Sequence, residues 1–428
     1  MRFLSFLAAF AVAAAPVAAS AQISPAKADA EVRKIVSSPG FRKAAAALEA
    51  GHDRWVAETI AITEIPAPPF KEEARAKAYA EMFRARGLTD VELDEEGNVL
   101  GLRKGSAGGP VLIVSAHLDT VFPEGTDVKV RREGDTLHAP GVGDDASGLA
   151  TQLALIDALN AANIRTRSDI LFVGTVGEEG LGDLRGVRHL LGKGKYRGRA
   201  KAFISLDGGG MDSMVTAGAG SKRYRVTFKG PGGHSYGAFG LVNPMAALSG
   251  AVSELYRIAV PASPKTTYSA SVVGGGTSVN SIPEEVWLEV DMRSESADAL
   301  ARLEQSFLAG VERAVVAENA ARSTREGKVT AELKPIGDRP AGQTGEGTDI
   351  VRFATAAWKA EGIALKYGSA STDANLPMSL GIPAVTLSRV ARNARAHSPD
   401  EWIGIEKADN VKLKRMALAT ILALAGTR

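Results

Sequence analysis

Short, continuous apolar runs mark the chain at 111–114, 169–176 and 202–206, and each is followed by acidic residues. Runs of this length that are rich in Val, Ile and Leu are typical of strands buried on both faces of a sheet. Apolar residues at three- and four-residue spacing predict helices within 22–88 and at 147–159, 349–361 and 410–425. Strands and helices that alternate in this way predict an α/β domain with a mostly parallel sheet.

The pattern changes between residues 218 and 334. Residues 222–229 alternate between polar and apolar, as in a half-exposed antiparallel strand. We then predict helices at 244–260 and 297–321, and strands at 268–274, 285–292 and 328–333. The order strand-helix-strand-strand-helix-strand is the split βαβ pattern of ferredoxin-like domains. We therefore predict a small α+β domain at 218–334, inserted into a catalytic domain that is formed by 22–217 and 335–428.

The first 21 residues have the composition of a secretory signal. Met1-Arg2 gives a positive start, residues 3–18 are apolar and rich in Ala, and Ala19-Ser20-Ala21 has the form of a cleavage site. The alternative is an uncleaved anchor, but the apolar stretch is shorter than the roughly 20 residues that a membrane span needs. We expect cleavage after Ala21, a periplasmic or secreted protein, and no membrane association once the segment is removed.

The net charge and the cysteine content limit which binding partners and which metal ligands we expect. With 51 basic and 49 acidic residues, the net charge of +2 gives no reason to expect nucleic acid or an anionic membrane as partner. The sequence has no cysteine. An oxidising compartment would thus contribute no disulfide, and any metal site must be built from His, Asp and Glu.

Polar residues collect where the predicted strands end. They are His117, Asp119, Asp144, Asp145, Glu178, Glu179, Asp207 and His397. Parallel strands bring their carboxyl ends to one edge of the sheet, where ligands bind in open α/β folds. Crowded carboxylates repel each other, and cations neutralise them. Two histidines and several carboxylates suit zinc, with cobalt or manganese possible, and they outnumber the ligands of one tetrahedral ion. Two metals that share a carboxylate would use them all, with a nearby Glu as general base.

Simpler interpretations exist for the paired acids. Glu178-Glu179 could form a solvated acidic turn, and Asp144-Asp145 could cap the helix that follows. A capping Asp can also bind metal, so the second alternative does not exclude the first.

Seven motifs carry a resemblance to a known family. They are HLDTV, GDDASG, GEEG, LDGG, GPGGHS, TSVNSIP and AHSPDEW, and they follow one another along nearly the whole chain after residue 21. In this set and order the sequence resembles the di-zinc exopeptidases of the aminoacylase, peptidase T and glutamate carboxypeptidase family, peptidase family M20. One difference lies in DDASG, where the family often has DDKG; this weakens any transfer of substrate preference.

The resemblance implies a role for each residue of the strand-end set. His117 and Asp207 would bind one zinc, Glu179 and His397 the other, and Asp144 would bridge both. Asp119 would orient the His117 ring, Glu178 would be the general base, and the Asp144–Asp145 peptide bond would be cis.

The small domain would be a lid that also forms a homodimer. His234 would stabilise the oxyanion, often in the partner's site, while Asn280 and Arg293 would hold the substrate. For His234 the alternative is a loop residue without a role, for Asn280 a turn residue, and for Arg293 a surface charge.

The expected function is hydrolysis of peptide bonds in short peptides, by a metal-activated water with Glu178 as general base. An aminopeptidase or di/tripeptidase is our first hypothesis. A carboxypeptidase or an N-acyl-amino-acid amidohydrolase of the same fold is the alternative, because Arg293 could grip a free carboxylate bidentately. A non-catalytic periplasmic binder of peptides or metal is the alternative from another class, and an intact Glu178 argues against it.

Overall fold

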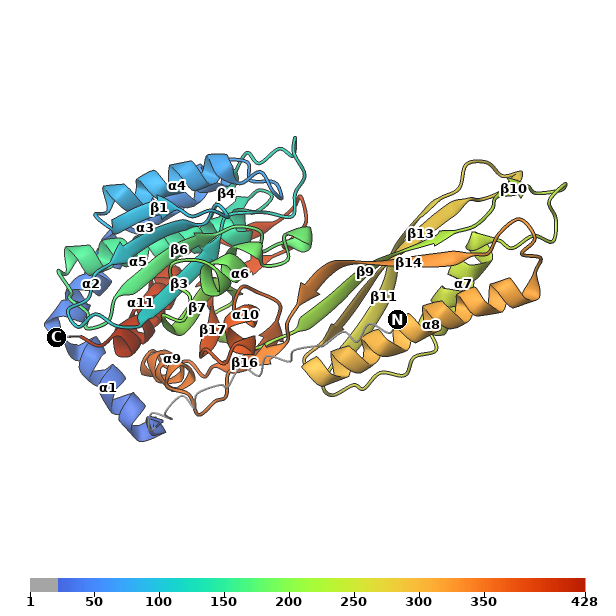
Figure 1. The fold of residues 1–428 in the computed structure, drawn as a ribbon. Coiled ribbons are helices and arrows are strands. Elements are labelled where there is room, and N and C mark those ends of the chain that lie inside the picture. The colour runs from blue at the N-terminus through green and yellow to red at the C-terminus, as the bar shows by residue number, and fades with distance from the viewer. Residues whose placement is uncertain (1–21, 428) are drawn as a thin grey trace, which may run out of the picture.

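The computed structural model describes residues 22–427, and the predicted signal segment 1–21 lies outside them. The chain forms a larger lobe, which contains both α1 (Pro25–Ser37) and α11 (Lys407–Ala425), and a smaller elongated lobe beside it (Figure 1). None of the helices within 22–427 is long and apolar enough to cross a membrane.

The larger lobe is built on a mixed sheet of nine strands. These are β1 (Thr89–Leu93), β2 (Val99–Arg103), β3 (Val111–His117), β6 (Ile170–Thr175), β7 (Ala200–Gly209), β8 (Ser213–Gly218), β15 (Gly342–Gln343), β16 (Lys366–Ala370) and β17 (Ala384–Val390). Their order is β1-β2-β6-β3-β7-β17-β8-β15, with β16 also paired to β8. The four central strands β6, β3, β7 and β17 are parallel. Antiparallel pairs flank them, so the sheet is mixed, and its parallel part is the centre that the apolar runs predict.

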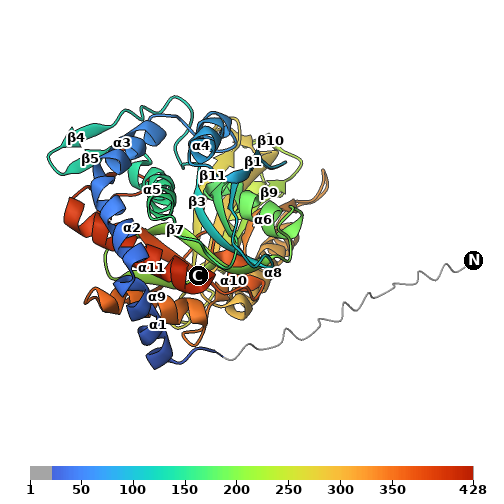
Figure 2. The same cartoon turned by 90° about the vertical axis from the view of Figure 1, so that its left-hand side faces the viewer.

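Helices cover both faces of this sheet (Figure 2). They are α1 (Pro25–Ser37), α2 (Pro39–Ala50), α3 (His52–Thr63), α4 (Glu73–Ala85), α5 (Gly148–Ala161), α6 (Arg185–Gly192), α9 (Asp349–Ala360), α10 (Asn375–Ser379) and α11 (Lys407–Ala425). Every residue of β3 is buried, and its side chains alternate between two cores. Leu112 and Val114 pack into the core that includes α1–α5, α9 and α11, whereas Val111 and Ile113 pack into the core with α6 and α10.

Local sequence sets several helix starts. Ser24 and Ser38 each accept a backbone N–H in the first turn of α1 and α2, and a proline occupies the first helical position of both helices. Ser296 likewise accepts the Ala299 N–H at the start of α8 (Ala297–Ala321), which has no proline at its first position.

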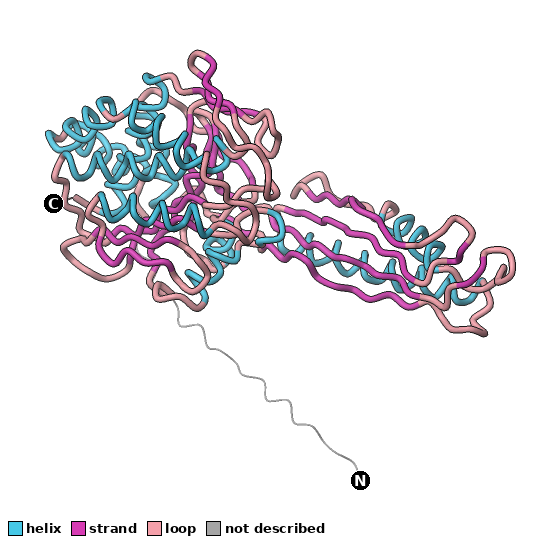
Figure 3. The backbone as a smooth tube through the Cα atoms, turned by 90° about the horizontal axis from the view of Figure 1, so that it is seen from above, coloured by secondary structure: helices cyan, strands magenta, loops and turns pink. Residues whose placement is uncertain are grey.

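The smaller lobe is an antiparallel sheet with two helices on one face. It consists of β9 (Gly220–Lys229), α7 (Pro244–Leu255), β11 (Thr266–Gly275), β13 (Glu285–Ser294), α8 (Ala297–Ala321) and β14 (Thr330–Arg339). The strand order β11-β13-β9-β14 is that of a ferredoxin-like unit, which confirms the predicted fold class. The strands run along the length of the lobe, away from the larger one (Figure 3).

Two elements of the smaller lobe differ from the prediction. Helix α7 ends at Leu255 rather than Val260. After its end the Ile258 N–H bonds three residues back, to the Leu255 carbonyl, and the Ile258 carbonyl accepts a hydrogen bond from the Tyr268 hydroxyl of β11. Strand β14 continues past residue 333 to Arg339, which pairs with Ser221 on β9. This extension carries β14 back to the larger lobe.

Two small sheets complete the fold. One has the order β18-β19-β5-β4, formed by β4 (Arg131–Glu133), β5 (Thr136–His138), β18 (Asn393–Ala394) and β19 (Trp402–Gly404). It ties the loop that carries His397 to the hairpin at 131–138. The other is a two-stranded ribbon of β10 (Gly233–His234) and β12 (Ser281–Ile282) in the smaller lobe.

Candidate metal centre and active site

Three neighbouring parallel strands deliver acidic and imidazole side chains to one edge of the large sheet. His117 is the last residue of β3, Asp207 lies near the end of β7, and Glu178 and Glu179 follow β6. His117 Nε2 lies 2.9 Å from Asp144 Oδ1 and 3.8 Å from Asp207 Oδ1. The predicted strand-end cluster therefore exists as one group of side chains.

His397 joins the same cluster through two other carboxylate oxygens. Its Nε2 lies 2.9 Å from Glu179 Oε1 and 3.3 Å from Asp144 Oδ2. Asp144 thus points one carboxylate oxygen at each histidine, which is the arrangement that a bridging ligand requires. The Asp144–Asp145 peptide bond is cis.

The donor set fits divalent metal ions. One potential ligand atom each from His117, Asp144 and Glu179 lies within 4.8 Å of the others, and the same holds for His117, Asp145 and Asp207. Imidazole and carboxylate donors without thiolates suit zinc, and also cobalt or manganese. The five predicted ligands His117, Asp144, Glu179, Asp207 and His397 are all within this cluster.

Backbone contacts fix the acids in place. The Asp119 carboxylate accepts the N–H groups of Glu178, at 3.0 Å, and of Glu179, at 2.8 Å. His117 Nδ1 lies 3.0 Å from the Asp119 carbonyl oxygen and 3.6 Å from its carboxylate. Asp119 therefore positions both glutamates and faces the far side of the His117 ring, as an orienting group does.

Comparison with known proteins bears on this site. The model of peptidase family M20/M25/M40 matches residues 113–421. The chain belongs to peptidase family M20/M25/M40. This family consists of hydrolases, so the match confirms the predicted family and enzyme class.

Individual relatives agree with this assignment. Carboxypeptidase G2 of Pseudomonas sp. (strain RS-16) is 34% identical over 84 residues, which are 19% of this chain and 20% of that protein. The match therefore spans about a fifth of that relative's length. Aminopeptidase PepT from Bacillus cereus has a similar fold, with a TM-score of 0.70 and 21% identity over 88% of this chain and 99% of that one. Bacillus subtilis YxeP, described as a dinuclear metal-binding peptidase, has a TM-score of 0.64 and 18% identity over 88% and 99% of the two chains.

Glu401 supports the turn before α5. Its carboxylate accepts the N–H groups of Gly141, Gly143 and Asp144, at 2.7–2.8 Å. Sequence reasoning did not assign it a role, although it stands in the AHSPDEW motif. Gly148, the first residue of α5, packs so tightly that an added Cβ would lie 2.1 Å from Asp145 Oδ1.

Two buried arginines enter the acidic cluster and were also missed. Arg339, at the end of β14, lies 3.1 Å from Glu178 Oε1 and also donates to the Glu178 carbonyl. Arg389, on β17, contacts Asp207, Asp144 and Asp145. The available signal was Arg389 itself, a charged residue two positions after the apolar run 382–387, since a charge in a buried strand requires a partner.

Burial and charge set the protonation of the cluster. Burial, aided by the negative charge of Glu179, raises the pKa of Glu178 to about 8 in the protein without metal. Hydrogen bonds to Asp144 and Glu179 raise the pKa of His397 to about 10. Burial opposes ionisation of Asp144, but Arg389 and the two histidines outweigh it and hold the pKa of Asp144 well below its usual range. The cluster thus retains protons near neutral pH that bound cations would displace.

A cleft of about 410 Å³ opens from the cluster. The metal-ligand candidates Asp144, Glu179, Asp207 and His397 line it together with Glu178, and so do Arg223, Arg293 and Arg339. Two other predicted residues, His234 and Asn280, line a separate hollow of about 650 Å³ on the smaller lobe. The structure therefore joins Arg293 to the cleft of its own chain, and it does not join His234 and Asn280 to it.

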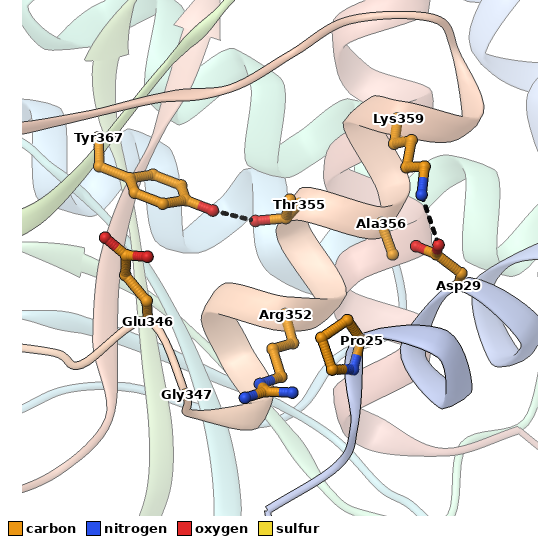
Figure 4. A pocket seen from close by; sticks show the side chains of 9 residues that line it. All are labelled: Pro25, Asp29, Glu346, Gly347, Arg352, Thr355, Ala356, Lys359 and Tyr367. Carbon is orange, nitrogen blue, oxygen red and sulfur yellow. Dashed lines mark hydrogen bonds and ion pairs between the residues drawn. The ribbon is translucent and has the colours of Figure 1, made fainter.

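Another depression, of about 320 Å³, lies between α1 and α9 (Figure 4). Two contacts join residues that line it. The Thr355 hydroxyl lies 2.8 Å from the Tyr367 hydroxyl, and Lys359 Nζ lies 2.6 Å from Asp29 Oδ2. None of the residues that line it also lines the acidic cleft.

The raised pKa values predict how stability depends on pH in the metal-free peptidase. Glu178 has an ordinary pKa of 4.5 and a folded pKa of about 8, so between these values the folded state holds a proton that the unfolded state has released. Stability must then fall as the pH rises from 4.5 to about 8. His397 acts in the same direction, because its raised pKa gives stability that is lost as the pH rises through about 10.

We therefore expect the urea midpoint of the metal-free protein to fall across this range. The Glu178→Gln variant should lose less stability than the wild type over the same range, because its amide does not ionise. Glu81→Gln, whose side chain is 72% exposed on α4, serves as the control and should behave like the wild type. Equal pH slopes for wild type and Glu178→Gln would contradict the assignment.

Proposed function

We propose that this peptidase is an exported di-zinc exopeptidase that hydrolyses short peptides with a free C-terminal carboxylate. The position of Glu178 is the observation that supports this proposal most directly. Its side chain is 5% exposed, it lines the cleft beside Asp144 and Glu179, and Arg339 and Asp119 hold its carboxylate and backbone. A carboxyl group held next to metal ligands without being needed as one is suited to proton transfer.

The proposed reaction uses Glu178 twice. Two bound zinc ions would lower the pKa of a water molecule and polarise the substrate carbonyl. Glu178 accepts the proton of the attacking water through its carboxylate and later passes this proton to the nitrogen of the leaving amine. Glu178 suits this role because its carboxylate lines the cleft beside the metal-ligand candidates and is held there by Arg339. His117, Asp144, Glu179, Asp207 and His397 would hold the ions.

The basic wall of the cleft supports a substrate with a free carboxylate. Arg223, Arg293 and Arg339 line the cleft from the smaller lobe, and Arg293 is 46% exposed and paired only with Asp291 among residues 22–427. Guanidinium groups bind carboxylates bidentately. Glu178 and the metal-ligand candidates line the same cleft, so the scissile bond would lie beside Glu178. Di- and tripeptides, whose C-terminal carboxylate lies close to a scissile bond, suit this arrangement.

The smaller lobe would act as a lid and as the homodimer surface. His234 and Asn280 lie away from the cleft of their own chain, which is compatible with a role of His234 in the site of a partner subunit. Tyr236 and Phe239 beside His234 are 89% and 91% exposed, and such apolar exposure supports a contact at this end of the lobe. The proposal that the protein is exported to the periplasm or the medium rests on the signal-like composition of residues 1–21.

A carboxypeptidase or an N-acyl-amino-acid amidohydrolase is the second candidate. The same three arginines favour it, because an N-acyl amino acid also presents a free carboxylate next to its scissile amide. A panel of free, N-blocked and C-amidated peptides and of N-acyl amino acids separates these substrates. The non-catalytic binder finds less support, because Glu178 is both present and held in place.

Replacement of Glu178 tests the reaction. Glu178→Gln keeps the shape of the side chain but removes the proton acceptor, so we expect kcat to fall about 10²–10⁴-fold while metal content stays at the wild-type level. Hydrolysis of the panel by the zinc-loaded protein and metal analysis of the same samples are the measurements. The exposed Glu81→Gln should retain full activity. A Glu178→Gln variant that retains wild-type kcat would refute the general-base role.

Replacement of Arg293 tests carboxylate recognition. We expect Arg293→Met to lower kcat/KM for peptides with a free C-terminus about tenfold or more. We expect C-amidated peptides to be poor substrates of the wild type and the substitution to leave their kcat/KM unchanged. Arg225→Met is the matched control, because Arg225 lies on the same sheet, is 42% exposed and is paired with Glu289. If both variants lose activity equally, or if amidation has no effect on the wild type, the carboxylate is not what Arg293 recognises.

A further inference from the structure

Arg389 brings a positive charge into the metal-ligand cluster. Its side chain is 3% exposed. One guanidinium nitrogen contacts both the carbonyl oxygen and Oδ1 of Asp207, a second lies 3.6 Å from Asp144 Oδ1, and Nε lies 3.5 Å from Asp145 Oδ1. Two of these three carboxylates, those of Asp144 and Asp207, are predicted metal ligands, so this arginine is more than a distant counter-ion.

The sheet fixes the position of Arg389. Strand β17 pairs in parallel with β7, and Ser388 on β17 faces Gly208 on β7, directly after Asp207. The Arg389 carbonyl oxygen accepts a hydrogen bond from Thr151 Oγ1 at 3.1 Å. Thr151 in turn accepts one from Trp55 Nε1, also at 3.1 Å. The backbone of Arg389 is therefore held by buried contacts that are independent of the carboxylates.

The two metal positions differ in their relation to this charge. At the His117 position, Asp144 Oδ1 and Asp207 Oδ1 face the imidazole, and the same two oxygens contact Arg389. At the His397 position, the facing oxygens are Asp144 Oδ2 and Glu179 Oε1. No ion pair joins Glu179 to an arginine or lysine within residues 22–427, where its side-chain partner is His397. Arg389 therefore acts on one position much more than on the other.

We propose that Arg389 makes the His117 position the weaker of the two metal positions, so that it fills second. The proposal rests on the two-metal centre of the proposed function. The guanidinium donates hydrogen bonds to oxygens that a cation at this position would use as ligands, and its charge repels that cation at short range in a buried site. In the absence of the second ion, the same contacts hold Asp144 and Asp207 in place. Arg389 is thus a positioning residue that sets the order of metal loading.

Metal titration of neutral variants tests this role. Zinc binding to chelator-stripped protein is followed by competition with a chromophoric chelator, and zinc content is measured by mass spectrometry after dialysis. We expect two binding steps in the wild type that differ about tenfold or more in Kd. In Arg389→Met the weaker step should tighten about tenfold or more, while the tighter step changes little. Arg392→Met, which removes a half-exposed arginine three residues further along the chain, should match the wild type.

Two further variants keep the test decisive if Arg389→Met does not fold without metal. Arg389→Gln also removes the charge and should tighten the weaker step, whereas Arg389→Lys keeps the charge and should retain two unequal steps. Two equal steps in the wild type, or an unchanged weaker step in the neutral variants, would overturn the proposal. These readouts do not depend on hydrolysis. An inactive protein that shows the expected titration would refute the peptidase mechanism alone, whereas a protein that binds less than one zinc would refute both.

Discussion

Mutual repulsion among carboxylates at the ends of three parallel strands is the constraint on which the active-site structure depends. Asp144, Glu178, Glu179 and Asp207 meet within a few ångströms in a buried region, where charges interact far more strongly than in water. Positively charged side chains in fixed positions offset part of this repulsion. His117 and His397 approach from two sides, and Arg339 and Arg389 enter from β14 and β17. Bound divalent cations would supply the remaining charge.

The two lobes divide the chemistry between them. The larger lobe supplies the acids and imidazoles, because parallel strands bring side chains from distant segments to one edge of the sheet. The smaller lobe supplies arginines at its junction with the larger one. The extension of β14 to Arg339 is the physical link, since it carries a lobe strand directly to Glu178. Acidic side chains of the larger lobe and arginines of the smaller lobe therefore line one cleft.

Much of the fold and of the metal centre could be predicted from the sequence, because both rest on strong local patterns. Continuous apolar runs identified β3, β6 and β7, and the polar residues after them identified the cluster. The flank formed by β8 and β15 could not be predicted in this way. Strand β8 alternates between buried and half-buried residues and has no continuous apolar run, β15 has two residues, and the pairing of both depends on tertiary contacts. The support groups Arg339, Arg389 and Glu401 were missed for a related reason. Each stands far along the chain from the acid or N–H group that it contacts, and single-sequence patterns do not report such pairings.

The central claim is that Asp144 joins two metal positions, and the most direct test is the metal content of two variants. After loading with zinc and removal of excess metal, we expect two ions per wild-type chain. Asp144→Asn should fall toward zero, because this residue faces both histidines, whereas Asp207→Asn should fall only toward one, because Asp207 faces His117 alone. Two ions retained in Asp144→Asn, or equal losses in both variants, would contradict the account.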